Sequence, residues 1–342
     1  MRLVLLAVVL GGAAAWWVQH PLRQDAEVLD LVVARGASAR DVARAIHDAG
    51  VQAPGDLLYA WFRLSGRSRE IKAGSYEIKR GSSPAAILDM LASGRQALRS
   101  VTLVEGWTFR QFREALAKAD HLQPESAGLS GAEIMARLGH EGVVPEGRFF
   151  PDTYVYPKNA SDLSVLRQAL QAMDQRLAAA WRARAADLPL QSPEQALILA
   201  SIIEKETGLA ADRAQIAGVF ANRLRIGMPL QTDPTVIYGA FEAQGQPFDG
   251  RLRRVHLDTD TPWNTYTRPG LPPTPIAMPG NAALMAAVQP QATNALYFVS
   301  RGDGSSQFSP SLSEHNRAVD QFIRAKPSAQ PPAQSPDQPS AH

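Results

Sequence analysis

The chain of 342 residues is 45% hydrophobic and 20% charged, a composition typical of globular proteins and sufficient for two modest domains. Because 35 lysines and arginines oppose 33 aspartates and glutamates, the formal charge is only +2, which gives no field strong enough to recruit nucleic acid. The chain has no cysteine, which excludes disulfides and thiolate chemistry, and its histidines never take the spacing of a helical zinc site, so we predict neither a metal nor a cofactor.

The first twenty residues suggest a membrane anchor. An uncharged stretch over 3–18 ends in Trp16 and Trp17, and tryptophan is enriched at membrane interfaces. Its length lies near the lower end of the range for a spanning helix. We therefore expect a transmembrane anchor over 1–20, with the rest of the chain exported. The alternative is a cleaved signal peptide, because the alanines at 13–15 resemble a cleavage site.

Three stretches repeat one plan, in which a β-rich segment leads through glycine to a residue that can cap a helix. They are LDLVVARGAS (29–38), YEIKRGSS (76–83) and VTLVEGWT (101–108), with Ser38, Ser83 and Thr108 as the caps. Another helix is expected over 56–65, where the apolar residues share a face. Together these segments predict a small α+β module over about 29–100.

The pattern over about 108–190 is mostly helical, whereas 192–325 mixes helix with a proline-rich irregular region, and together they predict a larger α+β domain over 101–325. The segment EGRFFPDTYVYP (146–157) is an exception, because its aromatic residues and bracketing prolines argue against a helix. A β-hairpin is predicted over 295–310, with its turn at Gly302-Asp303-Gly304. The last residues, 326–342, are almost without apolar side chains and should form a disordered tail.

The best-defined helix begins at Ser192-Pro193, where Ser192 can cap, Pro193 needs no amide partner and Gln195 can complete a capping box. It should run to Thr207, with Gly208 taking the left-handed turn that closes it. Between these ends, ALILASII (196–203) is apolar all round, which indicates a helix buried on most sides.

The last turn of this helix holds Glu204 and Glu206, which point about 200° apart around the axis and cannot form the cooperating carboxylate pair of glycosidases. A carboxyl group there meets the negative end of the helix dipole and an apolar wall, and both favour its protonated form. The Lys205 cation could offset this effect. A protonated carboxyl suits glycosidic cleavage, because the leaving oxygen needs a proton. The alternative is a solvated helix end with two ordinary glutamates.

Three long motifs follow in order: ASIIEKETGLAADRAQIAGVFANRLRIGMPLQTDPTVIYG (200–239), TPWNTYTRPGLPPTPIAMPG (261–280) and YFVSRGDGSSQFSPSLSEHN (297–316). Together with KAGSYEIKRG (72–81), LVEG (103–106) and EGRFFPDTYVYP, they closely resemble the membrane-anchored endolytic murein transglycosylases, the MltG/YceG-like family. The resemblance covers nearly everything between the anchor and the tail. It implies a single-pass inner-membrane enzyme with a periplasmic catalytic domain, which cuts nascent peptidoglycan strands beside the synthases that extend them.

The resemblance also implies a catalytic residue, because the family's catalytic glutamate stands in a Glu-Thr dipeptide, here Glu206. It would protonate the oxygen between MurNAc and GlcNAc and then take the proton of the MurNAc C6 hydroxyl, which closes a 1,6-anhydro ring. Since the nucleophile belongs to the substrate, no second carboxylate is needed. Glu204 then has a structural or supporting role, and the module over 29–100 is expected to be LysM-like.

The matching motifs supply candidate substrate-binding residues, whose polar groups could bond sugar hydroxyls and acetamido groups. They are Gln231, Thr232, Asp233, Tyr238, Asn264 and Tyr266. The alternatives are a helix start at Asp233-Pro234 and a core ring at Tyr238, while His315 is either a site residue or a structural polar contact. Two alternative functions stay open: a peptidoglycan-binding scaffold that does not cut, and a hydrolytic muramidase in which water attacks.

Overall fold

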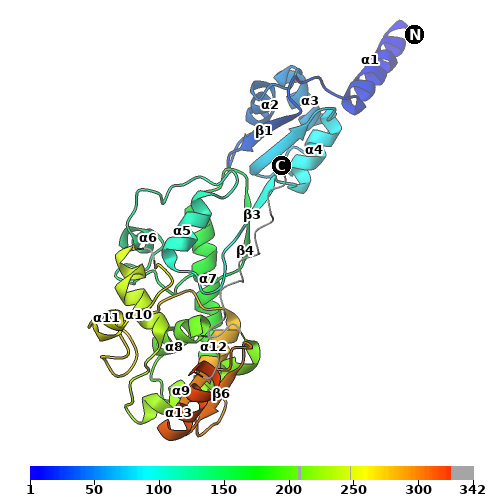
Figure 1. The fold of residues 1–342 in the computed structure, drawn as a ribbon. Helices are drawn as coiled ribbons and strands as arrows, with labels where there is room; N and C mark the ends of the chain where they lie inside the picture. The colour runs from blue at the N-terminus through cyan, green and yellow to red at the C-terminus, as the bar shows by residue number, and fades with distance from the viewer. Residues whose placement is uncertain (207–208, 247, 325–342) are drawn as a thin grey trace, which may run out of the picture. The chain divides into compact units, whose positions relative to one another are not determined.

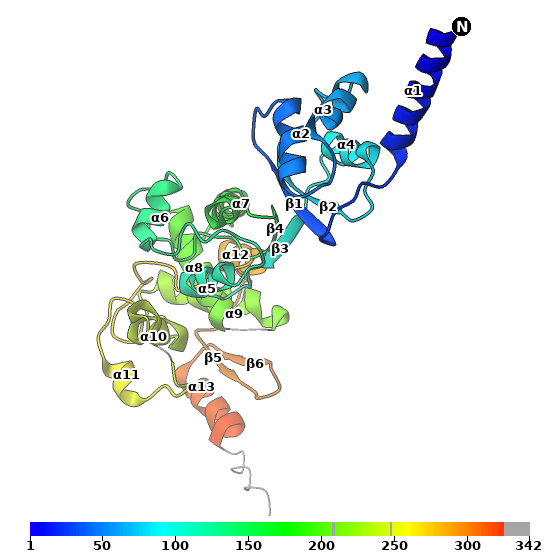
Figure 2. The same cartoon turned by 90° about the horizontal axis from the view of Figure 1, so that it is seen from above.

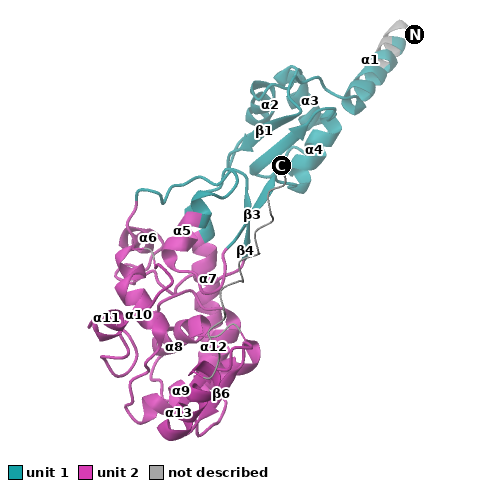
Figure 3. Cartoon of the chain, in the orientation of Figure 1, with its two compact units in different colours: residues 1–102, 115–128, 153–165 teal, residues 103–114, 129–152, 166–342 magenta. Residues whose placement is uncertain are grey.

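The computed structural model describes residues 1–206, 209–246 and 248–324 (Figure 1). Thr207, Gly208 and the predicted tail over 326–342 lie outside the described residues. The chain divides into two compact units: unit 1 comprises 1–102, 115–128 and 153–165, and unit 2 comprises 103–114, 129–152 and 166–342 (Figure 3). Within the described residues, helices combine with three antiparallel two-stranded sheets, so the predicted α+β class is confirmed.

Unit 1 contains the N-terminal helix and two of the sheets. Its elements are α1 (Arg2–Gln19), β1 (Val28–Val33), α2 (Ala39–Asp48), α3 (Gly55–Leu64), β2 (Gly74–Lys79), α4 (Pro84–Ser93), β3 (Leu98–Thr102) and β4 (Thr153–Pro157). β1 pairs with β2, and α2 and α3 lie between them in the chain. Alternate strand residues, including Leu31 and Tyr76, are buried against apolar residues of the three module helices, such as Ile46, Phe62 and Leu88. This alternation is what a half-buried sheet requires.

The predicted helix caps are confirmed. Ser38 Oγ accepts a hydrogen bond from the Asp41 amide, and the Asp41 side chain accepts one from the Ser38 amide, which completes a capping box. Ser83 accepts from the Ala86 amide in the same way, and α4 ends at Gly94 in the left-handed conformation. Thr108 caps α5 (Phe109–Ala117), because its Oγ1 accepts from the Gln111 amide at 3.4 Å.

The N-terminal residues form the helix α1, but the expectation of a transmembrane anchor over 1–20 is not supported. Over the part of the chain that the structure describes, no helix combines the length and the apolar character that crossing a membrane requires. Leu22, which follows α1, packs into the unit 1 core with Trp17 against it, so the end of this segment is joined to the module.

The aromatic segment over 146–157 contains no helix, as predicted, and supplies the strand β4, which pairs antiparallel with β3. Phe149 and Tyr156 are fully buried, and the Tyr156 hydroxyl donates to the Asp120 carbonyl at 2.7 Å. Phe149 stacks on Phe109 with 5.1 Å between ring centroids. The density of rings in this segment is therefore explained by packing.

Unit 2 is organised around α8, which ends at Glu206. Its elements are α6 (Gly131–Arg137), α8 (Pro193–Glu206), α9 (Ala210–Arg225), α10 (Asp233–Ala240), η1 (Glu242–Gln244), α11 (Arg254–Asp258), α12 (Asn281–Val288), β5 (Tyr297–Ser300), β6 (Ser306–Ser309), α13 (Leu312–Val319) and η2 (Asp320–Arg324). Both α5 and α7 (Asp162–Arg182) contribute residues to the two units. All eight residues over 196–203 are buried, and α12 lies alongside α8, with α9 and α10 also in contact.

The N-terminus of α8 confirms the predicted cap with one difference. Ser192 Oγ accepts from the Gln195 amide at 3.3 Å, as expected. The Gln195 side chain, however, accepts from the Gln191 amide rather than from that of Ser192. The side chain of Gln195 therefore bonds the amide one residue before the cap. This bond still satisfies a backbone amide that has no partner within the helix.

The predicted hairpin near the C-terminus is confirmed, with β5 and β6 side by side and α13 directly after them (Figure 2). Asp303 organises the turn, because its Oδ1 accepts from the amide and the hydroxyl of Ser305 at 2.9 and 2.7 Å. Gly302 and Gly304 have φ angles of 83° and 95°, which favour glycine. The hairpin and α13 pack on each other and bring Tyr297 and His315 into stacking contact.

Gly218 allows the close approach between α9 and the segment that leads to β5. A methyl group on its Cα would lie 2.4 Å from the carbonyl oxygen of Gln291, which is backbone and cannot turn aside. Asn222, one turn later, donates to the carbonyls of Thr293 and Ala295 at 2.8 and 3.0 Å. This contact fixes the position of β5 relative to α9.

We expect Gly218→Ala to lower the free energy of unfolding by about 1–3 kcal/mol, because overpacking against backbone outweighs the gain of about 1 kcal/mol in helix propensity. Urea titration followed by circular dichroism measures the change. Gly12→Ala is the matched control, since Gly12 is also helical but has no atom within 4 Å of the added methyl group. Equal effects of the two substitutions would contradict the close-approach argument.

Candidate active site

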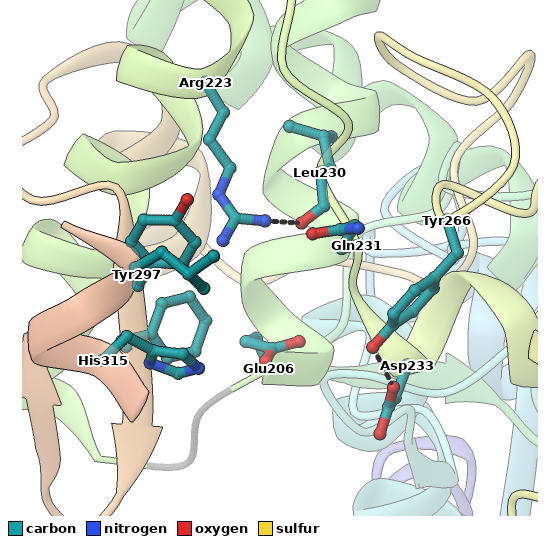
Figure 4. Close-up of a pocket in the computed structure, with 10 residues that line it drawn as sticks. Glu206, Arg223, Leu230, Gln231, Asp233, Tyr266, Tyr297 and His315 are labelled. Atoms are coloured by element: carbon teal, nitrogen blue, oxygen red, sulfur yellow. Dashed lines mark hydrogen bonds between the residues drawn. The ribbon is translucent and has the colours of Figure 1, made fainter. Parts of the chain in front are cut away.

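A cavity of about 330 Å³ lies at the C-terminal end of α8, and Glu206 forms part of its lining (Figure 4). The lining residues are Glu206, Arg223, Leu230, Gln231, Asp233, Tyr266, Tyr297, Phe298, Leu312 and His315. Figure 4 shows Glu206 between a wall that carries Tyr297 and His315 and an opposite wall that carries Tyr266 and Asp233. All ten residues belong to unit 2, so a single unit supplies the complete cavity.

The side chain of Glu206 is half-buried and lines the cavity. Its Oε2 accepts a hydrogen bond of 2.7 Å from Thr232 Oγ1, and Thr232 is itself buried. Burial raises the pKa of the Glu206 carboxyl, the Thr232 hydrogen bond lowers it, the negative charge of Asp233 raises it and Arg223 lowers it, with a net rise. The environment thus shifts the equilibrium toward the protonated form relative to a solvent-exposed glutamate, in the direction that the sequence predicts.

Glu204 occupies a different environment, although it lies in the same helical turn. Its Oε2 accepts from the Gly280 amide at 2.9 Å, and it does not line the cavity. Burial raises its pKa, which the Gly280 hydrogen bond opposes. Lys205 Nζ donates to the Gly106 carbonyl at 3.2 Å, and its cation is not among the groups that shift the pKa of Glu206. The two glutamates therefore bind separate partners, as their helical spacing predicts.

The segment just before α10 connects Glu206 to the Tyr266 loop. Gln231 has a φ angle of 49°, in the left-handed region that residues other than glycine rarely adopt. Its amide donates to the Thr265 carbonyl at 3.1 Å, and the Thr232 amide donates to Thr265 Oγ1 at 3.1 Å. These bonds hold the unusual backbone in place, and it presents Gln231 to the cavity while Thr232 reaches Glu206.

Asp233 and Tyr266, two of the candidate substrate-binding residues, lie together in one wall of the cavity. Tyr266 Oη donates to Asp233 Oδ1 at 2.7 Å, a bond drawn in Figure 4. Burial raises the pKa of Tyr266, and its hydrogen bond to the Asp233 carboxylate raises it further, so the phenol keeps its proton at neutral pH. The structure thus brings together Glu206, Gln231, Asp233 and Tyr266, with Thr232 directly behind the carboxyl.

Tyr238 and Asn264 are placed differently from the prediction, because neither lines the cavity. Tyr238 Oη donates to Glu146 at 3.3 Å, and its ring packs edge-on against Trp263. Asn264 is fully buried, and its Nδ2 donates to the carbonyls of Leu257 and Thr259 at 2.9 and 2.7 Å. Both side chains are therefore engaged in internal contacts and support the loops around the site instead of facing the cavity.

Glu146, the partner of Tyr238, is a second buried acid of unit 2. Burial raises its pKa to about 7, although the Phe109 amide donates to it at 3.0 Å. It is not part of the cavity lining, so its unusual pKa reflects a buried structural contact between the aromatic segment and α10.

Arg223 is the principal residue of the site that sequence reasoning missed. It is buried, and it donates from Nε to the Leu296 carbonyl at 2.7 Å and from Nη1 to the Leu230 carbonyl at 2.6 Å. It forms no ion pair with a carboxylate among the described residues. Its guanidinium lies over the Tyr297 ring, 5.3 Å from the centroid. The residue stands inside a matching motif, but nothing in the sequence places α9 against β5.

His315 completes the wall opposite Tyr266. Its ring stacks on Tyr297, with 5.2 Å between centroids and an interplanar angle of 25°. Burial lowers the pKa of His315 and the Arg223 charge lowers it further, so the imidazole is neutral near pH 7. Of the two roles that the sequence leaves open, the cavity position favours a site role.

The family comparison adds independent information to this geometry. The model of the YceG-like family matches residues 31–321. An endolytic murein transglycosylase of Bacillus subtilis (strain 168) is 30% identical over 346 residues, which cover 93% of this chain and 92% of the relative. A protein of the same name from Streptococcus pneumoniae (strain D39) is 25% identical over 330 residues, and the match spans 58% of that longer relative.

A solved structure also matches. The crystal structure of a YceG-like protein from Listeria monocytogenes aligns with a TM-score of 0.52 and 26% identity, covering 85% of this chain and 98% of the other. The family model thus spans most of the chain, and the Bacillus relative matches over nearly its full length. On these matches, this chain belongs to the YceG-like family.

Proposed function

We propose that this chain cuts peptidoglycan glycan strands internally at the bond between MurNAc and GlcNAc, with Glu206 as the group that transfers the proton. Its family and the names of its relatives identify it as a lytic transglycosylase. The observation that carries the catalytic assignment is the state of Glu206: a carboxyl of raised pKa that opens into a cavity and is bonded by a neutral hydroxyl, not by a cation.

In the proposed reaction, one carboxyl serves both steps. Protonated Glu206 gives its proton to the glycosidic oxygen as the bond from this oxygen to C1 of MurNAc breaks. The C6 hydroxyl of the same sugar then bonds to C1, and the Glu206 carboxylate takes the hydroxyl proton, which returns the acid to its starting form. The products are a released chain end and a 1,6-anhydro ring, and no water is consumed. The second carboxylate of the cavity, Asp233, accepts the Tyr266 hydrogen bond and has no part in this proton transfer.

The walls of the cavity have distinct proposed roles. Gln231 and the Tyr266–Asp233 pair offer hydrogen-bonding groups to sugar hydroxyls and acetamido groups. Arg223 is near enough for its charge to lower the pKa of Glu206, so it stabilises the carboxylate that exists between the two steps. It does so without forming an ion pair that would keep Glu206 ionised at rest.

The location and the partners belong to the same proposal. Peptidoglycan strands are extended in the periplasm, so we place the enzyme on the periplasmic side of the inner membrane, beside the synthases. The β1–α2–α3–β2 order of unit 1, with its strands antiparallel, supports a LysM-like module that contacts glycan. Cutting within a strand would end its elongation.

Product analysis separates this proposal from its two rivals. The full chain is incubated with uncrosslinked glycan strands, and the products are analysed by mass spectrometry. We expect 1,6-anhydro-MurNAc ends. Reducing ends would instead identify a hydrolytic muramidase, and intact strands in the presence of a folded protein that binds them would identify a scaffold.

We expect Glu206→Gln to lower the cleavage rate by at least about 10²–10⁴-fold, because the amide can neither donate the proton nor take one back. The substituted side chain still accepts the Thr232 hydrogen bond, so the thermal unfolding midpoint should stay close to that of the wild type. Glu204→Gln is the matched control, since its amide oxygen can still accept from Gly280 and a measurable rate should remain. Full activity of Glu206→Gln would end the assignment.

We expect the pH dependence of kcat/KM to report the Glu206 proton. The acid must be protonated to act, so activity persists above the usual carboxyl range and falls as pH rises through the raised pKa. Thr232→Val removes a hydrogen bond that stabilises the anion and should move this fall to higher pH. Asp233→Asn removes a repelling charge and should move it to lower pH. Shifts in the same direction would contradict the assignment.

A further inference from the structure

Unit 1 contains a groove that the proposed reaction does not use. Its volume is about 620 Å³, and three of its lining residues are arginines from different parts of the chain. Arg40 stands near the start of α2, Arg63 in the last turn of α3, and Arg69 in the loop that follows. The lining residues include no carboxylate, so the groove carries a concentrated positive charge in a chain whose formal charge is only +2.

These arginines differ from others in the same unit. Arg67, Arg95 and Arg99 are each ion-paired, for example Arg95 with Asp89 at 2.6 Å and Arg99 with Glu77 at 2.7 Å. Arg40, Arg63 and Arg69 form no ion pair with a carboxylate in the described residues. Hydrogen bonds from Ser38 and then the Arg40 charge lower the pKa of the neighbouring Asp41 carboxylate, but none of the three guanidiniums is held in an ion pair among the described residues, so an anion in the groove would gain favourable charge interactions with them.

The groove also positions some of its donors in advance. The Arg40 guanidinium lies over the Tyr59 ring, 4.7 Å from the centroid, which limits its freedom. The Asp41 carboxylate next to it accepts from the amide and the hydroxyl of Ser38 at 3.0 and 2.7 Å, so it caps α2 and does not pair with Arg40. The hydroxyl of Ser68 is a further polar group in the lining.

We propose that this groove is a binding site for a phosphate-bearing anion. A guanidinium presents a planar fork of donors that matches two oxygens of a phosphate, and three such forks around one groove can bind several phosphate oxygens at once. A single carboxylate offers two oxygens and one charge, whereas a pyrophosphate or a row of lipid headgroups offers more of both. Soluble phosphates and phospholipid headgroups share this chemistry, and the site would give unit 1 a ligand independent of the cavity at Glu206.

The test measures binding of the full chain to two probes: inorganic pyrophosphate by titration calorimetry, and vesicles of phosphatidylglycerol by co-sedimentation, with phosphatidylcholine vesicles as the neutral reference. We expect binding to at least one phosphate probe, weakened by added salt. Binding to pyrophosphate alone identifies a soluble phosphate as the source, and binding to vesicles alone identifies a headgroup. Either result supports the site, and binding to neither probe overturns it.

Substitution then locates the binding. The triple variant Arg40→Gln, Arg63→Gln and Arg69→Gln should weaken it by at least about tenfold, since three charge-assisted contacts are lost. The control triple variant Arg23→Gln, Arg35→Gln and Arg44→Gln removes the same net charge from the same unit outside the groove and should have little effect. Equal weakening by the two variants overturns the proposal, because net charge alone would then explain binding. Strand cleavage is measured separately and does not enter this result.

Discussion

The burial of one apolar helix that ends in a carboxyl group is the constraint on which the rest of unit 2 depends. Because α8 is apolar on every side, other elements must cover it, and α9, α10 and α12 pack around it. Two of these covering helices also line the cavity: α9 through Arg223 and α10 through Asp233. The packing that removes α8 from water thus also builds the walls around Glu206, so stability and site geometry have one origin.

Glu204 and Glu206 lie in one helical turn, yet only Glu206 is proposed to be catalytic. Burial raises the pKa of both carboxyl groups. Glu204 is held by the Gly280 amide outside the cavity, whereas Glu206 opens into it and is held by the Thr232 hydroxyl. A raised pKa therefore does not identify the catalytic acid by itself, and access to a space large enough for a sugar separates the two residues.

Short sequence patterns predict the helix caps of this chain well. They do not predict contacts between residues that are far apart in the sequence. Each cap at Ser38, Ser83 and Thr108 depends on residues within three positions, so short patterns suffice to find it. The family motif around Asn264 contains both a residue that faces the cavity and one that supports the loop, and the motif alone does not distinguish them. Asn264 binds Leu257 and Thr259 because of how its loop folds back, which periodicity does not reveal.

Arg223 lines the cavity but was not predicted from the sequence, and its contacts matter for the proposed chemistry. Burying a guanidinium is costly unless its donors are satisfied, and the usual solution is a carboxylate partner. Here carbonyl oxygens of Pro229, Leu230 and Leu296 satisfy it instead. These bonds join α9 to the segment before α10 and to the start of β5, so one cation fixes two sides of the cavity. Because that cation is satisfied by neutral groups, it forms no ion pair with Glu206, which leaves this carboxyl available for the proton transfer that we propose.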